Sequence, residues 1–246
     1  MDIIKKLAQE LTIKEEQAKA AVQLIDEGNT IPFIARYRKE MTGALNDETL
    51  RNLHERLLYL RNLEEKKEQV INAITEQDKM TDDLKKKILA AEALVAVDDL
   101  YRPYRPKKQT RATKAKEKGL EPLANILLLQ ATSKSMEEEA QSFVDEAKGV
   151  VNAKEALAGA KDIIAEMIAD KADYRKSIRN CTMKQGRLVV KAKDEKAESV
   201  YEMYYDFSEE LSKITGYRVL AINRGEKEKF LTVKVEAPVS YTHLTL

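Results

Sequence analysis

The chain has 246 residues, of which 35% are charged and 43% hydrophobic, and its 43 lysines and arginines almost balance its 42 acids. Helix-forming residues abound while only eight glycines and five prolines occur, so composition favours a mainly α-helical chain of one large or two small domains. No stretch approaches the roughly 18 apolar residues of a membrane span, and no signal-peptide core begins the chain. The single cysteine, Cys181, excludes an internal disulfide, which fits a cytoplasmic protein.

The first 45 residues predict three short helices, arranged like a helix-turn-helix unit. The first is expected over residues 2–10. The motif at 12–15 resembles a capping box that opens a second helix, which Gly28 ends. Pro32 suits the first turn of the third helix.

Residues 46–186 predict a helical body. Asp47 is expected to cap its longest helix, which runs to about Asp78 and has leucines at heptad spacing that polar Glu64 and Lys67 interrupt. The interruption favours packing inside an elongated bundle over a free coiled coil. Further helices are expected at 82–89, 122–129, 136–148 and 152–185.

Residues 187–237 predict a small mixed α/β part. Residues 187–192 and 229–236 alternate between apolar and polar side chains, as β-strands do. A helix is expected around Tyr201 to Phe207, and residues 217–223 suit either a strand or a short helix. The predicted fold class is therefore mainly α with minor β structure.

The motifs of common enzymes are missing. The glycines are too widely spaced for a dinucleotide-binding or Walker loop, and His54, Cys181 and His243 are too scattered for a zinc site. Asp98 and Asp99 could hold Mg²⁺ with a third carboxylate, or could instead pair with a neighbouring arginine. We expect no catalytic residues, cofactor, metal or small-molecule substrate.

A basic segment at residues 101–118 is the main candidate for function. It holds eight lysines and arginines and one acid, Glu117, in a chain of net charge +1. Cationic side chains attract phosphate, and tyrosine rings offer stacking surfaces for bases. The alternative is a solvated loop whose tyrosines and arginine stems pack on the bundle. The candidate contacts are Tyr101, Arg102, Tyr104, Arg105, Lys107, Lys108 and Arg111.

Arg36, Arg38 and Lys39 form a second basic cluster within the helix-turn-helix-like unit. We expect it to contribute less to nucleic-acid affinity than residues 105–111.

Three motifs resemble the Tex family of bacterial transcription accessory proteins. They are the run TIPFIARYRKE at 30–40 with Thr42-Gly43, the block from Asp99 to Ala124, and the block from Tyr205 to Glu226. The chain differs from the family pattern at Gly216-Tyr217 and at Lys229-Phe230. Residues 238–246 are unlike the family, and we expect them to be a non-native tail that adds nothing to folding.

The resemblance implies a helical amino-terminal region of a much longer cytoplasmic protein. In that family an RNase-H-like domain not thought to be an active nuclease, helix-hairpin-helix elements and an OB-fold RNA-binding module follow. This region alone is then expected to be non-enzymatic and to bind RNA or DNA weakly and without specificity, with the transcription machinery as a further partner. The alternative is a helical scaffold that binds other proteins and makes no nucleic-acid contact.

Overall fold

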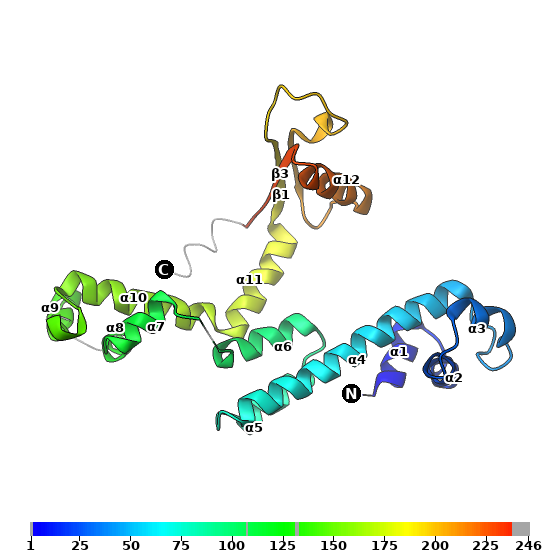
Figure 1. Cartoon of the computed structure of the whole chain (residues 1–246), viewed down its shortest axis with the longest axis horizontal. Coiled ribbons are helices and arrows are strands. Elements are labelled where there is room, and N and C mark those ends of the chain that lie inside the picture. The colour runs from blue at the N-terminus through cyan, green and yellow to red at the C-terminus, as the bar shows by residue number, and fades with distance from the viewer. Residues whose placement is uncertain (1, 107, 131–132, 238–246) are drawn as a thin grey trace. The chain divides into compact units, whose positions relative to one another are not determined.

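The computed structural model describes residues 2–106, 108–130 and 133–237 (Figure 1). Within these residues the chain forms twelve α-helices and one three-stranded sheet, which confirms the predicted mainly α fold class. The chain divides into two compact units, Met1–Arg105 and Pro106–Leu246. Each unit is described by itself.

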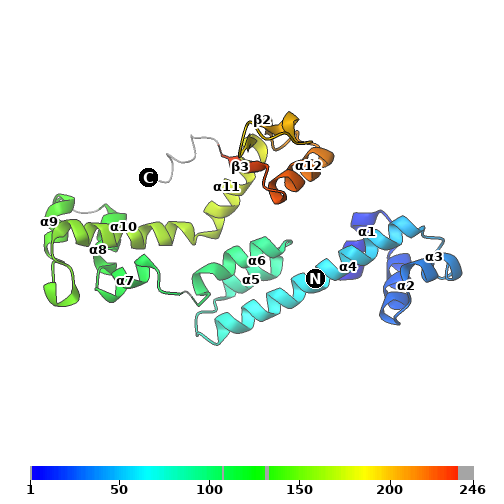
Figure 2. The same ribbon diagram turned by 45° about the horizontal axis from the view of Figure 1, so that its top comes forward.

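Unit 1 is organised around one long helix, α4 (Asp47–Thr75). Helices α1 (Ile3–Leu11), α2 (Glu15–Asp26) and α3 (Ile31–Tyr37) gather about its first half (Figure 2). Their apolar faces meet in one core, which supplies most of the driving force for this three-helix arrangement. Its fully buried members include Leu7, Leu24, Ile34, Leu50 and Leu57.

Two helix starts differ from the sequence-based expectation. Thr12 does not cap α2; it ends α1 with a left-handed backbone, at φ 55°. Helix α2 begins after Lys14, whose backbone N–H donates to Oε1 of Gln17 at 3.1 Å. Asn46, and not Asp47, caps α4 by accepting a hydrogen bond from the N–H of Thr49. The expected cap of α2 thus lies two residues before the observed one, and the expected cap of α4 lies one residue after it. Differences of this size are usual for helix ends.

The second half of α4 packs against α5 (Asp82–Ala90), α6 (Leu94–Tyr101) and the short 3₁₀ turn η1 (Arg102–Tyr104). The buried seam of α4 continues here without a break, and its members are Leu63, Lys67, Val70 and Ile74. The apolar run at 94–97, to which the sequence pattern assigned no type, opens α6.

Unit 2 begins with four helices around a shared core. Helices α7 (Arg111–Glu117), α8 (Glu121–Leu129) and α9 (Met136–Gln141) pack on α10 (Ala153–Ala169). The expected helix at 136–148 is wrong in its second half. There the chain leaves α9, makes a bridge between Asp145 and Val150, and turns through η2 (Glu146–Lys148).

The expected single helix at 152–185 is two helices. Helix α10 ends at Ala169, and α11 (Ala172–Gln185) starts after Lys171. Only Cys181 is buried on α11, so this helix packs little of its surface against the described part of the chain. It leads through Gly186 into the sheet.

The sheet has the order β2-β1-β3 with both pairings antiparallel. Strands β1 (Arg187–Ala192) and β3 (Leu231–Glu236) confirm the two predicted strands. The helix expected around Tyr201 to Phe207 is wrong: a 3₁₀ turn, η3 (Glu202–Tyr204), leads into strand β2 (Asp206–Glu210). Residues 217–223 lie in helix α12 (Gly216–Lys227), which packs against β3.

Candidate nucleic-acid interface

The basic segment is divided between the two units. Residues up to Arg105 belong to unit 1, and those from Pro106 onward belong to unit 2. Lys107 lies outside the described residues. The expected contact residues therefore come from both units: those up to Arg105 from unit 1, and Lys108 and Arg111 from unit 2.

The tyrosines of the basic segment pack against the hydrophobic core of unit 1. Tyr101 and Tyr104 are half-buried and pack against the apolar cluster at the end of α4. The side chain of Gln77 donates to the carbonyl of Tyr104 at 3.0 Å, and the guanidinium of Arg105 lies 5.9 Å from the ring centre of Tyr101. This placement matches the alternative in which tyrosines pack on the bundle. Arg102 and Arg105 remain exposed at this end of α4.

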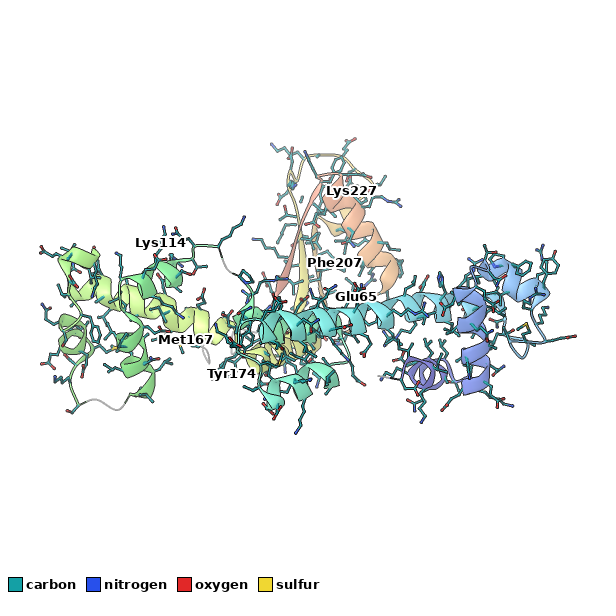
Figure 3. All side chains as sticks on the ribbon, turned by 60° about the horizontal axis from the view of Figure 1, so that its bottom comes forward. Glu65, Lys114, Met167, Tyr174, Phe207 and Lys227 are labelled. Carbon is teal, nitrogen blue, oxygen red and sulfur yellow. The ribbon has the colours of Figure 1, made fainter. Side chains whose placement is uncertain are left out.

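The unit 2 part of the segment carries exposed cations on and before α7. Lys108 is exposed, and Arg111 opens α7 after Thr110, whose hydroxyl caps the helix. Arg111 Nε lies 3.6 Å from Oδ1 of Asp162 on α10, while its side chain is 87% exposed. Lys114 stands further along α7 (Figure 3).

A groove of about 390 Å³ runs between α7 and α10. Arg111 and Lys114 line it from α7 and Lys118 from the residue that ends this helix, because spacings of three and four residues place side chains on one helix face. Glu155 and Asp162 line it from α10. Lys118 already donates from Nζ to the carbonyl of Gly149 at 2.6 Å. The groove is thus of mixed charge and has fewer free cations than the sequence suggests.

The second basic cluster lies at the end of α3. This helix ends at Tyr37, so Arg38 and Lys39 stand in the turn that follows and not on the helix. Arg36, Arg38 and Lys39 are all exposed. The guanidinium of Arg38 lies 5.2 Å from the ring centre of Phe33, within the range of a cation–π contact. Helix α3 packs near the start of α4, whereas η1 lies by its far end (Figures 1 and 2).

Residues that the sequence analysis did not single out hold this turn in shape. The hydroxyl of Thr42, which is fully buried, donates to the carbonyl of Arg38 at 3.2 Å. Gln17 of α2 donates from Nε2 to the carbonyls of Thr42 and Gly43, at 3.2 and 2.9 Å. Gly43 has φ 61°, and a Cβ there would lie 2.7 Å from Nε2 of Gln17. The turn therefore favours glycine at this position, because of its backbone angle and because a Cβ would displace the Gln17 amide from its hydrogen bonds.

The pair Asp98 and Asp99 lies in α6. Asp98 Oδ1 lies 3.7 Å from Nζ of Lys66, and Asp99 is buried. Among the described residues no group of three His, Cys, Asp or Glu side chains is placed to hold a metal ion. Nor is any helix that these residues form long and apolar enough to cross a lipid bilayer.

Fold and surface together define a mainly helical chain in two units, with exposed basic clusters at the end of α3 and around α7. Residues 1–75 match the family described as "Tex-like protein N-terminal domain", and residues 131–244 match "Tex central region-like". The chain belongs to the Tex family, of which it represents the amino-terminal region.

Curated relatives cover nearly the whole chain. Protein YdcI of Bacillus subtilis (strain 168) is 44% identical over 96% of this chain and 33% of its own length. The transcriptional accessory protein Tex of Neisseria gonorrhoeae is 40% identical over 100% of this chain and 32% of its own length. Human S1 RNA-binding domain-containing protein 1 is 32% identical over 95% of this chain and 24% of its own length. The chain thus spans about a third of the length of the bacterial relatives.

Proposed function

We propose that this chain is the helical amino-terminal part of a cytoplasmic, nucleic-acid-associated transcription accessory protein. In this role it catalyses no reaction and contacts RNA or DNA weakly and without sequence preference. The names of two relatives support the class: one is a transcriptional accessory protein, and the other carries an S1 RNA-binding domain.

The observation that carries the proposal is the set of exposed cations without acidic partners. Among the described residues, Arg36, Lys39 and Lys108 have no carboxylate within ion-pair distance, and Arg111 is only loosely paired with Asp162. Cations that the fold does not neutralise are available to phosphates, and their binding releases counterions from the nucleic acid. The expected affinity is then in the non-specific range, with Kd roughly 10⁻⁴ to 10⁻⁶ M at physiological salt.

The test is the salt dependence of binding to fluorescein-labelled RNA and DNA, each single- and double-stranded. Three to five phosphate contacts predict a log–log slope of about −3 to −4.5 on duplex DNA. Replacing Arg105, Lys108 and Arg111 by glutamine should flatten this slope by about one to two units. The same change at Arg36, Arg38 and Lys39 is the second variant.

The matched control removes three charges elsewhere. Lys79, Lys85 and Lys86 are exposed, and among the described residues none of them forms an ion pair. Asp78, Asp82 and Asp83 are their neighbours in the sequence and lower the local positive potential, so replacing the three lysines by glutamine should flatten the slope less than either cluster variant does. An equal loss of affinity in all three variants would show that net charge alone governs binding. Absence of binding at low salt would contradict the proposal.

The second candidate, a protein-binding scaffold, is favoured by a different observation. In unit 2, large apolar side chains stand in solvent around the sheet: Val200, Met203, Tyr217 and Leu220. Exposed apolar side chains are usual contacts in protein–protein interfaces. A chain that ignores nucleic acid at low salt but co-elutes with a protein partner through these residues would support this function instead.

A further inference from the structure

The end of α3 combines an exposed aromatic ring with cations. Tyr37 is 61% exposed, and Arg36, Arg38 and Lys39 surround it in the sequence. The ring of Tyr37 is supported by that of Phe33, one helical turn earlier, with 5.3 Å between ring centres and a 46° tilt. Tyr101 and Tyr104 are half-buried in a core, so Tyr37 is better placed to meet a ligand than either tyrosine of the basic segment.

The turn that follows Tyr37 is held by hydrogen bonds. Gln17 from α2 and the buried Thr42 fix the turn that follows, through three hydrogen bonds to backbone carbonyls. A binding surface that is already ordered loses little conformational entropy when a ligand binds. The fold therefore orders the backbone that carries Arg38 and Lys39 next to Tyr37.

The cations at the end of α3 differ from three other arginines of unit 1 in that they have no carboxylate partner. Arg51, Arg56 and Arg61 each bind a carboxylate: Asp47, Glu10 and Asp26 respectively. Arg36, Arg38 and Lys39 bind none within the described residues, although Glu40 is their neighbour in the sequence. Positive charge that no internal carboxylate neutralises, beside an exposed ring, suits a ligand that offers both phosphates and flat unsaturated rings.

We propose that Tyr37 is a base-stacking residue for single-stranded nucleic acid, with Arg36, Arg38 and Lys39 contacting the phosphates on either side. This inference rests on the proposed function. It adds that the bound nucleic acid is single-stranded and that Tyr37 is the residue on which a base stacks. Single strands fit because their bases can leave the stack and lie on an aromatic side chain. In a duplex the base faces are covered by neighbouring base pairs. The contact is independent of sequence, since every base has a flat face.

The first test compares Tyr37→Ala and Tyr37→Phe in binding to labelled oligo(U), oligo(dT) and a duplex of equal length at low salt. Loss of the ring should weaken single-strand binding roughly five- to 100-fold, as the loss of one stacked base does. Duplex binding should change less than twofold. Tyr37→Phe should bind as the parent does, because the ring face remains. The control is Tyr217→Ala, which removes a ring of similar exposure, 65%, that also has an arginine next to it.

A second test reads stacking directly. The chain contains no tryptophan, so Tyr37→Trp introduces a single fluorescent indole at the proposed site. Oligo(U) and oligo(dT) should quench this fluorescence with the same Kd as the anisotropy assay, whereas duplex should not. A Tyr217→Trp protein should show no quenching. Circular dichroism of every variant confirms that the helices are intact.

The outcomes separate the two proposals. Normal single-strand binding by Tyr37→Ala, or an indole that stays unquenched in Tyr37→Trp, overturns the stacking role and leaves the proposed function standing if the charge variants still lose affinity. Equal loss on single strands and duplexes also overturns stacking. Failure of the parent protein to bind any nucleic acid overturns both. If the Tyr37→Trp protein binds polyglutamate more tightly than oligo(U), both are overturned in favour of an acidic protein segment as the ligand.

Discussion

Lys67 is the residue whose environment is least expected from its chemistry. It is 1% exposed in the apolar seam of α4. Its ammonium donates to Oε1 of Glu64 at 2.8 Å and to the carbonyl of Leu89 at 3.0 Å. Leu89 lies in the last turn of α5, where carbonyls lack partners within the helix. Lys67 therefore caps α5 from α4 and joins the two helices.

This arrangement predicts an order of stability at position 67. Lys67→Ala removes both the hydrogen bonds and the packed side-chain stem, and should cost about 2–4 kcal/mol of unfolding free energy. Lys67→Met refills the space but leaves the Leu89 carbonyl unpaired, and should cost about 1–2 kcal/mol. Urea unfolding followed by circular dichroism measures both. A Met variant no more stable than the Ala variant would show that packing of the stem contributes little.

The sequence predicts the position of Lys67 but not its role. Heptad spacing places residue 67 in the seam, yet a lysine there is naturally interpreted as an interruption. Its acceptor, the carbonyl of Leu89, is 22 residues further along the chain, and only the packing of α5 on α4 brings it into reach. The same holds for Gln17, which reaches the turn at Gly43 across 26 residues. Contacts of this range leave no local pattern.

At the scale of elements, two forked ion pairs tie α1 and α2 to α4. Arg56 donates through Nε and Nη2 to Glu10 at 2.5 and 2.8 Å, and Arg61 donates through two nitrogens to Asp26 at 2.7 Å each. The hydrogen bonds from Arg56 hold the pKa of Glu10 below its ordinary value of 4.5, and those from Arg61 hold the pKa of Asp26 below 3.8. Both pairs are partly exposed, so solvent weakens them.

These pKa shifts predict the pH dependence of unit 1. A carboxylate whose pKa is lower in the folded state stabilises the fold above its ordinary pKa, and this stabilisation is lost as pH falls through the folded pKa. The double variant Glu10→Gln, Asp26→Asn should therefore be less stable at pH 7 by about 0.4–2 kcal/mol, with each pair contributing roughly 0.2–1. The difference should shrink as pH falls below the ordinary pKa of Glu10, 4.5, and in high salt.

The control replaces two carboxylates that lie on α4 without a cation. Among the described residues Glu55 and Glu68 are exposed and form no ion pair, so Glu55→Gln with Glu68→Gln should change stability little at either pH. Thermal unfolding at several pH values gives the comparison. A stability difference for the Glu10 and Asp26 variant that grows as pH falls would contradict the sign.

Element types are predicted well where the hydrophobic period is long and clear, as in α4 and β1. The predicted types are wrong where the spacing of apolar residues fits both a helix and a strand. From Tyr201 to Phe207 the aromatic spacing suits a helix, but Phe207 pairs with Val190 across the β2–β1 ladder, and pairing with another strand decides the outcome. Residues 152–185 are all compatible with helix, and no proline or glycine marks the break after Asp170.

At the scale of the whole molecule, each unit has its own cores. Unit 1 contains the cluster of α1 to α4 and the cluster at the end of α4. Unit 2 contains the cluster around α10 and the cluster between α12 and the sheet. The boundary at Arg105 and Pro106 falls inside the basic segment, where no Gly- or Ser-rich linker signals it. Residues 101–105 of the basic segment therefore belong to unit 1, and Lys108 and Arg111 belong to unit 2. The expected non-native tail at 238–246 lies outside the described residues.

Separate cores predict that unit 1 folds without unit 2. A protein of residues 1–105 keeps every residue of both unit 1 clusters, together with Gln77 and Tyr104, whose hydrogen bond joins η1 to the turn that follows α4. It should be helical by circular dichroism and unfold cooperatively on heating.

Because Tyr37 and its cations lie wholly within unit 1, the protein should also keep the proposed single-strand binding and its sensitivity to Tyr37→Ala. A protein of residues 106–237 should show only the contacts of Lys108 and Arg111, with no preference for single strands. A 1–105 protein that unfolds without cooperativity would mean that its cores need unit 2, whereas a folded one that has lost single-strand binding would place the stacking residue elsewhere.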